Sequence, residues 1–129
     1  MQVVDTNIVL RYILEDHEEL SALAKKIIDE NRVEAPVEVL CEVVYVLSSI
    51  YKVKRKEISE RLKFFFTVTG CELPHRNAVL IGLDIFAETK LGIIDCILIG
   101  YNKCENARIH TFDKALQMVL DKRVPHDEP

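Results

Sequence analysis

The chain opens with Gln2-Val3-Val4-Asp5-Thr6-Asn7, a short apolar run that ends in three polar residues. An apolar run of this kind is typical of a strand, whereas Asp, Thr and Asn favour helix caps and turns. From Ile8 onward, apolar residues recur at helical spacing. The opening therefore predicts a strand, a polar turn and a helix in direct succession.

The same alternation of short strands and helices continues through the chain. Further strands are predicted at Arg32–Ala35, Cys71–Leu73 and Ala107–Thr111. Helical periodicity covers six more stretches, which are Leu20–Ile28, Val39–Ile50, Ile58–Phe66, Asn77–Thr89, Asp95–Asn106 and Ala115–Leu120. Strands interleaved with helices indicate a parallel sheet with helices on both faces. The residues from 124 to 129 have no periodicity, which predicts a frayed tail.

Length and composition predict one globular domain over residues 1–129. The chain has 129 residues, of which 49% are hydrophobic and 29% are charged, so it can bury a core. Its longest apolar runs, Ala78–Leu83 and Cys96–Tyr101, are too short to span a membrane. The net charge of −4 argues against a surface that coats nucleic acid all round. Four cysteines without a CxxC pair, and no signal peptide at the start, predict a reduced, cytoplasmic protein.

Three aspartates stand where the predicted fold collects ligands. In open parallel α/β sheets, ligands bind beyond the carboxyl ends of the strands. Asp5 follows the first predicted strand, Asp113 follows the last one, and Asp95 begins a nearly all-apolar helix. We therefore expect the three carboxylates to face one crevice.

A fourth carboxylate, Glu42, borders the buried stripe of its predicted helix. Glu38, one turn earlier, lies close to the same line and could take its place. Each acid also has a purely structural interpretation. Asp95 and Asp113 could be helix N-caps, and Glu42 could lie on a solvated helix edge.

Several carboxylates that are brought together repel one another unless a cation neutralises them. Mg²⁺ or Mn²⁺, as one or two ions, suits oxygen ligands and also accepts phosphate oxygens. The chemistry this predicts is metal-assisted hydrolysis of a phosphodiester. A zinc site is not expected, because the four cysteines and four histidines show no ligand spacing.

Four segments carry a resemblance to a known family: Val3–Asn7, Glu42–Leu47, Ile94–Ile99 and His110–Lys114. In this order, over nearly the whole chain, they resemble PIN-domain proteins. The closest resemblance is to the ribonuclease toxin of VapBC-type toxin–antitoxin pairs. The resemblance implies a three-layer α/β/α domain with a central parallel sheet of four or five short strands.

The resemblance also implies roles for individual residues. Catalytic and metal-binding roles fall to Asp5, Glu42, Asp95 and Asp113, and supporting polar roles fall to Asn7, Thr111 and Thr6. It further implies Mg²⁺ or Mn²⁺, an RNA substrate, a homodimer and a small antitoxin partner. The apolar Phe64–Phe66 run could contribute to such an interface, although burial in the core is its other interpretation.

The basic segment, defined as Lys52, Lys54, Arg55 and Lys56, could bind the RNA backbone, because phosphate contacts supply most non-specific affinity. The alternative interpretation of the basic segment is a solvated loop and helix face without a ligand. The sequence leaves open a housekeeping RNA-processing nuclease, a nuclease acting on DNA flaps, and an inactive RNA- or protein-binding module. A phosphoacceptor signalling domain is disfavoured, because Asp5 lacks an adjacent acid.

Overall fold

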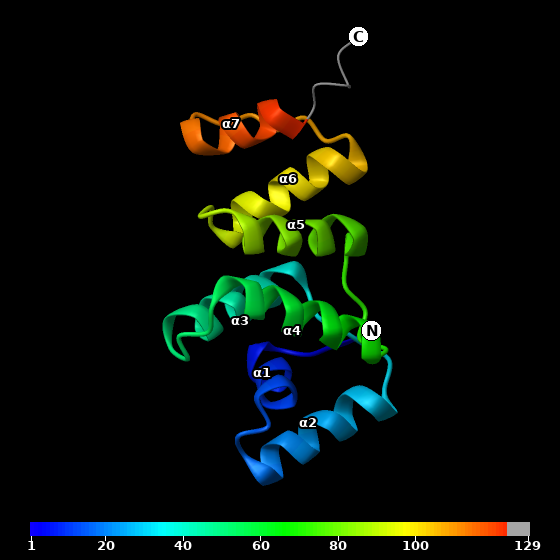
Figure 1. Cartoon of the computed structure of the whole chain (residues 1–129). Helices are drawn as coiled ribbons and strands as arrows, with labels where there is room; N and C mark the ends of the chain where they lie inside the picture. The colour runs from blue at the N-terminus through cyan, green and yellow to red at the C-terminus, as the bar shows by residue number, and fades with distance from the viewer. Residues whose placement is uncertain (124–129) are drawn as a thin grey trace. The chain divides into compact units, whose positions relative to one another are not determined.

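The structure, a computed structural model, describes residues 1–123, with the side chain of residue 123 left out. The frayed tail expected for 124–129 lies outside the described residues. Residues 1–123 form seven helices and two short strands (Figure 1). In chain order, these elements are β1 (Gln2–Val3), α1 (Thr6–Leu14), α2 (Glu18–Glu30), β2 (Val33–Glu34), α3 (Val37–Ser49), α4 (Arg55–Val68), α5 (Arg76–Glu88), α6 (Ile93–Glu105) and α7 (Lys114–Arg123).

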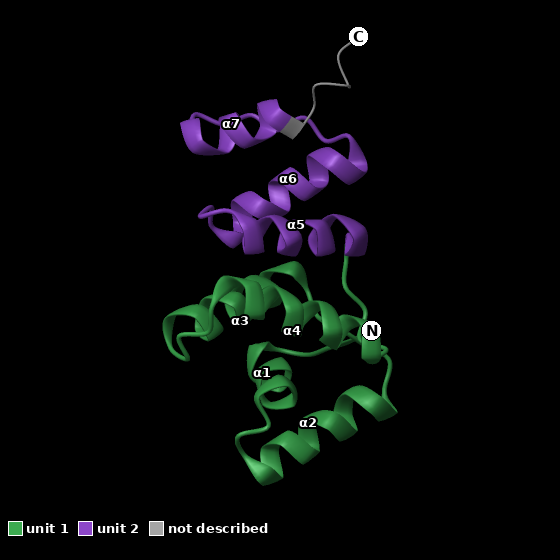
Figure 2. Ribbon diagram, viewed as in Figure 1, with its two compact units in different colours: residues 1–74 green, residues 75–129 purple. Residues whose placement is uncertain are grey.

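The chain divides into two compact units, residues 1–74 and residues 75–129 (Figure 2). Unit 1 holds both strands and helices α1 to α4, whereas unit 2 holds helices α5 to α7. None of the described helices is long and apolar enough to cross a membrane.

The sheet of unit 1 is small and parallel, with β2 in the middle. Val3 of β1 pairs with Glu34 of β2, and Glu34 also forms a parallel bridge with Glu72. The Glu72 N–H donates to the carbonyl of Val33 at 2.8 Å, and the Ala35 N–H donates to the carbonyl of Glu72 at 2.9 Å. The strands predicted near residues 2–4 and 32–35 are therefore confirmed, and the one predicted at Cys71–Leu73 is present as a single bridge.

The strand predicted at Ala107–Thr111 is wrong. These residues form an irregular segment between α6 and α7, in which the Ala107 N–H donates to the Tyr101 carbonyl at 3.3 Å and the Asn102 side chain donates to the Ala107 carbonyl at 3.0 Å. A strand needs a neighbouring strand for its backbone hydrogen bonds, and unit 2 has none among its described residues.

The sheet is consequently smaller than expected, with two strands and one bridge in the described chain in place of four or five strands. The chain is mostly helical, with the parallel pairing that an α/β fold requires. The three-layer arrangement stays a prediction.

The core of unit 1 is built by the apolar faces of α3 and α4. Helix α3 begins after Pro36, whose φ of −60° suits a helix start. It buries Leu40, Val43, Val44 and Leu47, and α4 buries Ile58, Leu62, Phe65 and Phe66. The ring of Phe65 makes an edge-to-face contact with Tyr12 of α1, at 5.1 Å between centroids. This contact fixes α1 against α4.

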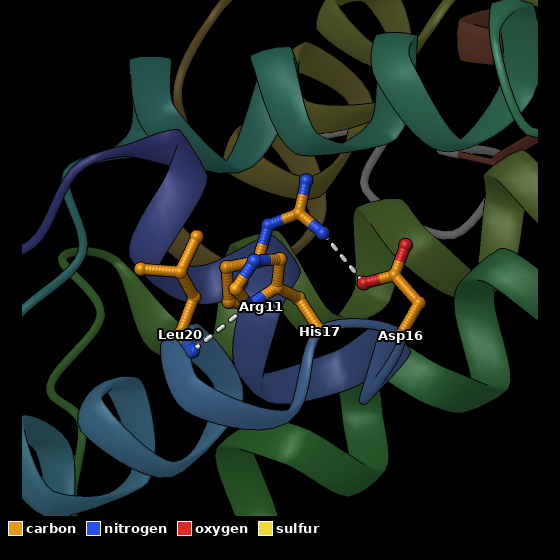
Figure 3. A network of polar contacts seen from close by, with 4 residues as sticks. All are labelled: Arg11, Asp16, His17 and Leu20. Carbon is orange, nitrogen blue, oxygen red and sulfur yellow. Dashed lines mark hydrogen bonds and ion pairs between the residues drawn. The ribbon is translucent and has the colours of Figure 1, made fainter.

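The corner between α1 and α2 is closed by side chains (Figure 3). The Nδ1 atom of His17 accepts a hydrogen bond from the Leu20 N–H at 3.1 Å, so His17 caps α2. Arg11 forms an ion pair with Asp16 at 2.5 Å. Glu15 adopts a left-handed conformation, with φ of 53°, and ends α1. The direction of α2 is therefore set by local contacts.

Unit 2 is held together by the close approach of α5 and α6. A Cβ atom added at Gly100 of α6 would lie 2.0 Å from the carbonyl oxygen of Ala78 in α5. At Gly82 of α5, an added Cβ would lie 3.1 Å from the carbonyl oxygen of Cys96. The two helices can approach this closely only because these positions lack side chains.

Candidate metal-dependent nuclease site

Asp5 lies directly after β1 and acts as the N-cap of α1. Its Oδ1 atom accepts a hydrogen bond from the Ile8 N–H at 3.1 Å. The other carboxylate oxygen makes no hydrogen bond within the described part of the chain, and the residue is exposed. Capping thus fixes the carboxylate while leaving one oxygen for a ligand.

Glu42 is hydrogen-bonded to Thr6, the residue that follows Asp5. The Thr6 hydroxyl, at the first residue of α1, donates to Glu42 Oε1 on α3 at 2.7 Å. The two residues are separated by 36 positions in sequence, so no local pattern indicates the contact. Glu38, one turn earlier on α3, is exposed and forms no hydrogen bond with any described residue. It is therefore Glu42, of the two, that lies at the tip of β1.

Asp95 has no structural partner to explain it. The N-cap of α6 is Gly92, so Asp95 is the third residue of the helix and neither begins it nor caps it. The N-cap interpretation of Asp95 is wrong, because the helix starts two residues earlier. The side chain is half-buried and forms no hydrogen bond or ion pair with the described residues.

Asp113 precedes α7 and is an N-cap. Its Oδ1 atom accepts from the Leu116 N–H at 2.9 Å. Its own N–H donates to the hydroxyl oxygen of Thr111 at 2.9 Å. Thr111 therefore supports Asp113 directly, whereas Asn7, the corresponding polar residue near Asp5, is exposed and has no hydrogen bond to the described chain.

The candidate carboxylates are thus arranged as Asp5 with Glu42 in unit 1, and as Asp95 and Asp113 in unit 2. No cluster of three or more His, Cys, Asp or Glu side chains that could hold a metal ion is found among the described residues. Mg²⁺ is commonly bound by one or two carboxylates, with waters and substrate phosphates as its other ligands. The candidate ligands are all carboxylates, and some of their oxygens make no hydrogen bond within the described chain, so their chemistry suits such an ion.

Two of the four cysteines, Cys41 and Cys71, are poor candidates for an alternative nucleophile. None of the four cysteines forms a disulfide. Burial raises the pKa of Cys71 to about 11, and burial together with the charge of Glu38 raises the pKa of Cys41, the residue before Glu42. Both thiols stay protonated near neutral pH, and a protonated thiol is a poor nucleophile.

The basic segment lies between α3 and the first turn of α4. Lys52, Lys54 and Lys56 are exposed and make no ion pair with the described residues, whereas Arg55 is half-buried and has a partner. Lys52 has a φ of 57°, and the next residue, Val53, is fixed by a hydrogen bond from its N–H to the Leu47 carbonyl at 2.9 Å. The three lysines are therefore presented by an ordered turn.

A family comparison identifies the class of this chain. The model of the PIN domain matches residues 3–120, so the chain belongs to the PIN domain family. No curated protein and no solved structure matches it. PIN domains form an α/β family of nucleases that typically bind divalent metals, and the matched range includes all four candidate carboxylates.

Proposed function

We propose that the chain is a divalent-metal-dependent endoribonuclease and the toxin of a VapBC-type toxin–antitoxin pair, with residues 1–129 acting as one domain. The observation that carries the proposal is the hydrogen bond from Thr6 to Glu42. It brings an acid from α3 to the polar turn after β1, where a nuclease of this class needs its carboxylates. If Glu42 were only a solvated residue on the surface of α3, this contact would not be needed.

The residues proposed to hold Mg²⁺ or Mn²⁺, as one or two ions, are Asp5, Glu42, Asp95 and Asp113. When bound, such an ion supplies a water of lowered pKa and offsets charge on the scissile phosphate. The chain's own part is to keep the carboxylate oxygens fixed. The N–H of Ile8 does so for Asp5, and the Thr6 hydroxyl does so for Glu42.

In unit 2, the carboxylate of Asp113 is oriented by the Leu116 N–H, and its backbone by Thr111. Asp95 is half-buried and has no partner among the described side chains, so its carboxylate oxygens are uncommitted and available to a cation. Asn7 is proposed to hydrogen-bond to a substrate or water, because nothing in the described chain engages it.

The basic segment is proposed to contact RNA phosphates through Lys52, Lys54 and Lys56. Support comes from their exposure and from the lack of ion pairs to described residues. Arg55 is expected to contribute less, because it already has a partner.

The proposed partners are a second copy of the chain and a small antitoxin. A cavity of about 340 Å³ in unit 1, lined by both apolar and charged side chains, supports a binding partner at this surface. It is lined by Tyr12, Ile13, Leu14 and Phe65, with Phe64 exposed beside it and Glu15 and Arg61 supplying charge. An apolar side chain of an antitoxin, flanked by polar groups, would suit this lining.

One observation favours a different class. Asp5 and Asp113 both act as N-caps, which is what a non-catalytic RNA- or protein-binding module would retain. Asp95 and Glu42 distinguish the two functions, because neither is a cap.

The test is cleavage of a labelled single-stranded RNA in Mn²⁺, in Mg²⁺ and in EDTA. We expect cutting in both metals and none in EDTA. Glu42→Gln should lose activity, and Glu38→Gln, one turn away on the same exposed helix face, should retain it. Equal activity of the two variants would contradict the assignment of Glu42. Absence of metal-dependent cutting by the wild type would favour the non-catalytic module.

A further inference from the structure

The segment between α6 and α7 presents a row of exposed side chains. Exposed and half-buried residues alternate from residue 107 to residue 112, with the half-buried positions at Ala107, Ile109 and Thr111. Alternation with a period of two is the pattern of an extended chain. The exposed residues of this row, together with the first residue of α7, are here called the 108–114 strip and consist of Arg108, His110, Phe112 and Lys114.

Phe112 is the most conspicuous member of the strip. Its exposed fraction is 106%, the highest among the large apolar side chains of the described residues. A buried phenylalanine contributes substantially to folding stability, and this ring contributes nothing of that kind. Its position therefore calls for a role outside the described fold.

The exposure of the ring is not the result of a loose backbone. The Asp113 N–H, one residue later, donates to the Thr111 hydroxyl oxygen, and Asp113 in turn caps α7. The carbonyl of Asp113 accepts from the Gln117 N–H at 3.0 Å. The residues on both sides of Phe112 are thus fixed while the ring itself remains in solvent.

Cationic side chains flank the ring. Arg108 and Lys114 are exposed and form no ion pair with the described residues, and His110 lies between Arg108 and Phe112. Within residues 108–114 these two cations outnumber the single acid, Asp113, in a chain whose net charge is −4. Surfaces that bind single-stranded nucleic acid combine these two features, with cations on the backbone and aromatic rings under the bases.

We propose that the 108–114 strip binds single-stranded RNA, with Phe112 stacking against an unpaired base beside Asp113. This inference rests on the proposed function and adds to it a residue that binds a base of the substrate. Arg108 and Lys114 contact phosphates on either side of the stacked base. Phe112 is a positioning residue, because it holds the strand and takes no part in the chemistry. A duplex is disfavoured, because its bases are already stacked on one another.

The experiment measures binding separately from cutting. A fluorescein-labelled oligouridine of about 12 nucleotides, within the site sizes known for single-strand binders, is titrated with the full chain in EDTA, and anisotropy is followed. Phe112→Ala should weaken binding by about 5- to 150-fold. Phe112→Trp should restore it, and Phe112→Leu should not. The control is Met118→Ala on α7, which removes another exposed apolar side chain, 59% exposed, and should bind as the wild type does.

Phe112→Ala is expected to fold normally, because the ring is fully exposed, and its melting temperature should equal that of the wild type. In Mn²⁺, its KM for RNA should rise while kcat changes little. A blunt-ended RNA duplex should bind wild type and Phe112→Ala equally.

Two results would overturn the inference. The first is that wild type and Phe112→Ala bind RNA with equal affinity and cut it with equal KM. Because the wild type still cuts RNA in that case, the proposed function would be unaffected. The second is a change in oligomeric state on substitution, measured by size-exclusion chromatography, which would assign Phe112 to a protein interface. Conversely, if RNA binding depends on Phe112 but no metal-dependent cutting is found, the 108–114 strip would be supported as an RNA-binding surface and the proposed nuclease activity would be refuted.

Discussion

The contact between Thr6 and Glu42 can be tested by Thr6→Val, which keeps the shape of the side chain and removes the hydroxyl. The O–H···O distance of 2.7 Å is typical of a hydrogen bond to a charged acceptor. Such bonds contribute about 1.5–3 kcal/mol when they are protected. Glu42 is exposed, so water competes and we expect the variant to lose about 1 kcal/mol of unfolding free energy.

The assay is a double-mutant cycle of Thr6→Val and Glu42→Ala, in which each substitution removes one partner of the hydrogen bond. Unfolding free energies from urea titration and RNA cleavage rates are measured on the same four proteins. The predicted coupling in stability is about 1 kcal/mol. Thr6→Ser should retain both stability and activity, because the donor is kept. Cleavage should fall in Thr6→Val, since Glu42 loses the group that orients it.

A coupling energy no larger than the additivity error of about 0.3–0.5 kcal/mol would refute the reasoning. In that case the Thr6 hydroxyl would not hold Glu42 in solution, and the proposed site would lose the observation that carries it. Activity retained in Thr6→Val together with full coupling would limit the contact to a structural role.

Four further results are expected. Asp5→Asn should abolish cleavage and leave metal-free stability nearly unchanged, because Asn caps helices about as well as Asp; a large loss of stability without metal would make Asp5 a structural cap. Gly100→Ala should destabilise the fold by about 1–3 kcal/mol in thermal melts, because its Cβ would overlap the Ala78 carbonyl, and Gly70→Ala, whose added Cβ meets nothing within 4 Å, is the control. Replacing Lys52, Lys54 and Lys56 by Ala should reduce the slope of the logarithm of the RNA-binding constant against the logarithm of the salt concentration by about 2. An unchanged slope would show that these lysines do not contact the RNA. His17→Ala should cost about 1 kcal/mol of stability through loss of the α2 cap, and His17→Asn should recover it in urea titrations.

The helices and caps of this chain were accessible from sequence because the forces behind them are local. The apolar spacing in α3 and α4 predicts the residues that are buried there. Asp5 and Asp113 were recognisable as residues that could cap the helices after them, and both do so.

The errors arose where distant parts of the chain decide the structure. The alternating pattern of residues 107–111 resembles a strand, but a strand also needs a partner, which the segment itself cannot specify. Asp95 looked like a helix start because Gly92, the actual N-cap, contributes no side chain. The Thr6–Glu42 contact joins residues 36 positions apart, and only the packing of α1 against α3 creates it.

The measurement that tests the central claim most directly is Mn²⁺ binding by isothermal titration calorimetry, on the wild type and on Asp95→Asn, with circular dichroism confirming that both are folded. Asp95 is the candidate ligand without a structural role among the described contacts, so its substitution should not disturb the fold. We expect the wild type to bind Mn²⁺ and Asp95→Asn to bind it about 10- to 100-fold more weakly, by analogy with the loss of a metal-site group. A folded wild type that binds no Mn²⁺ would refute the proposed metal site and leave the carboxylates as caps and surface residues.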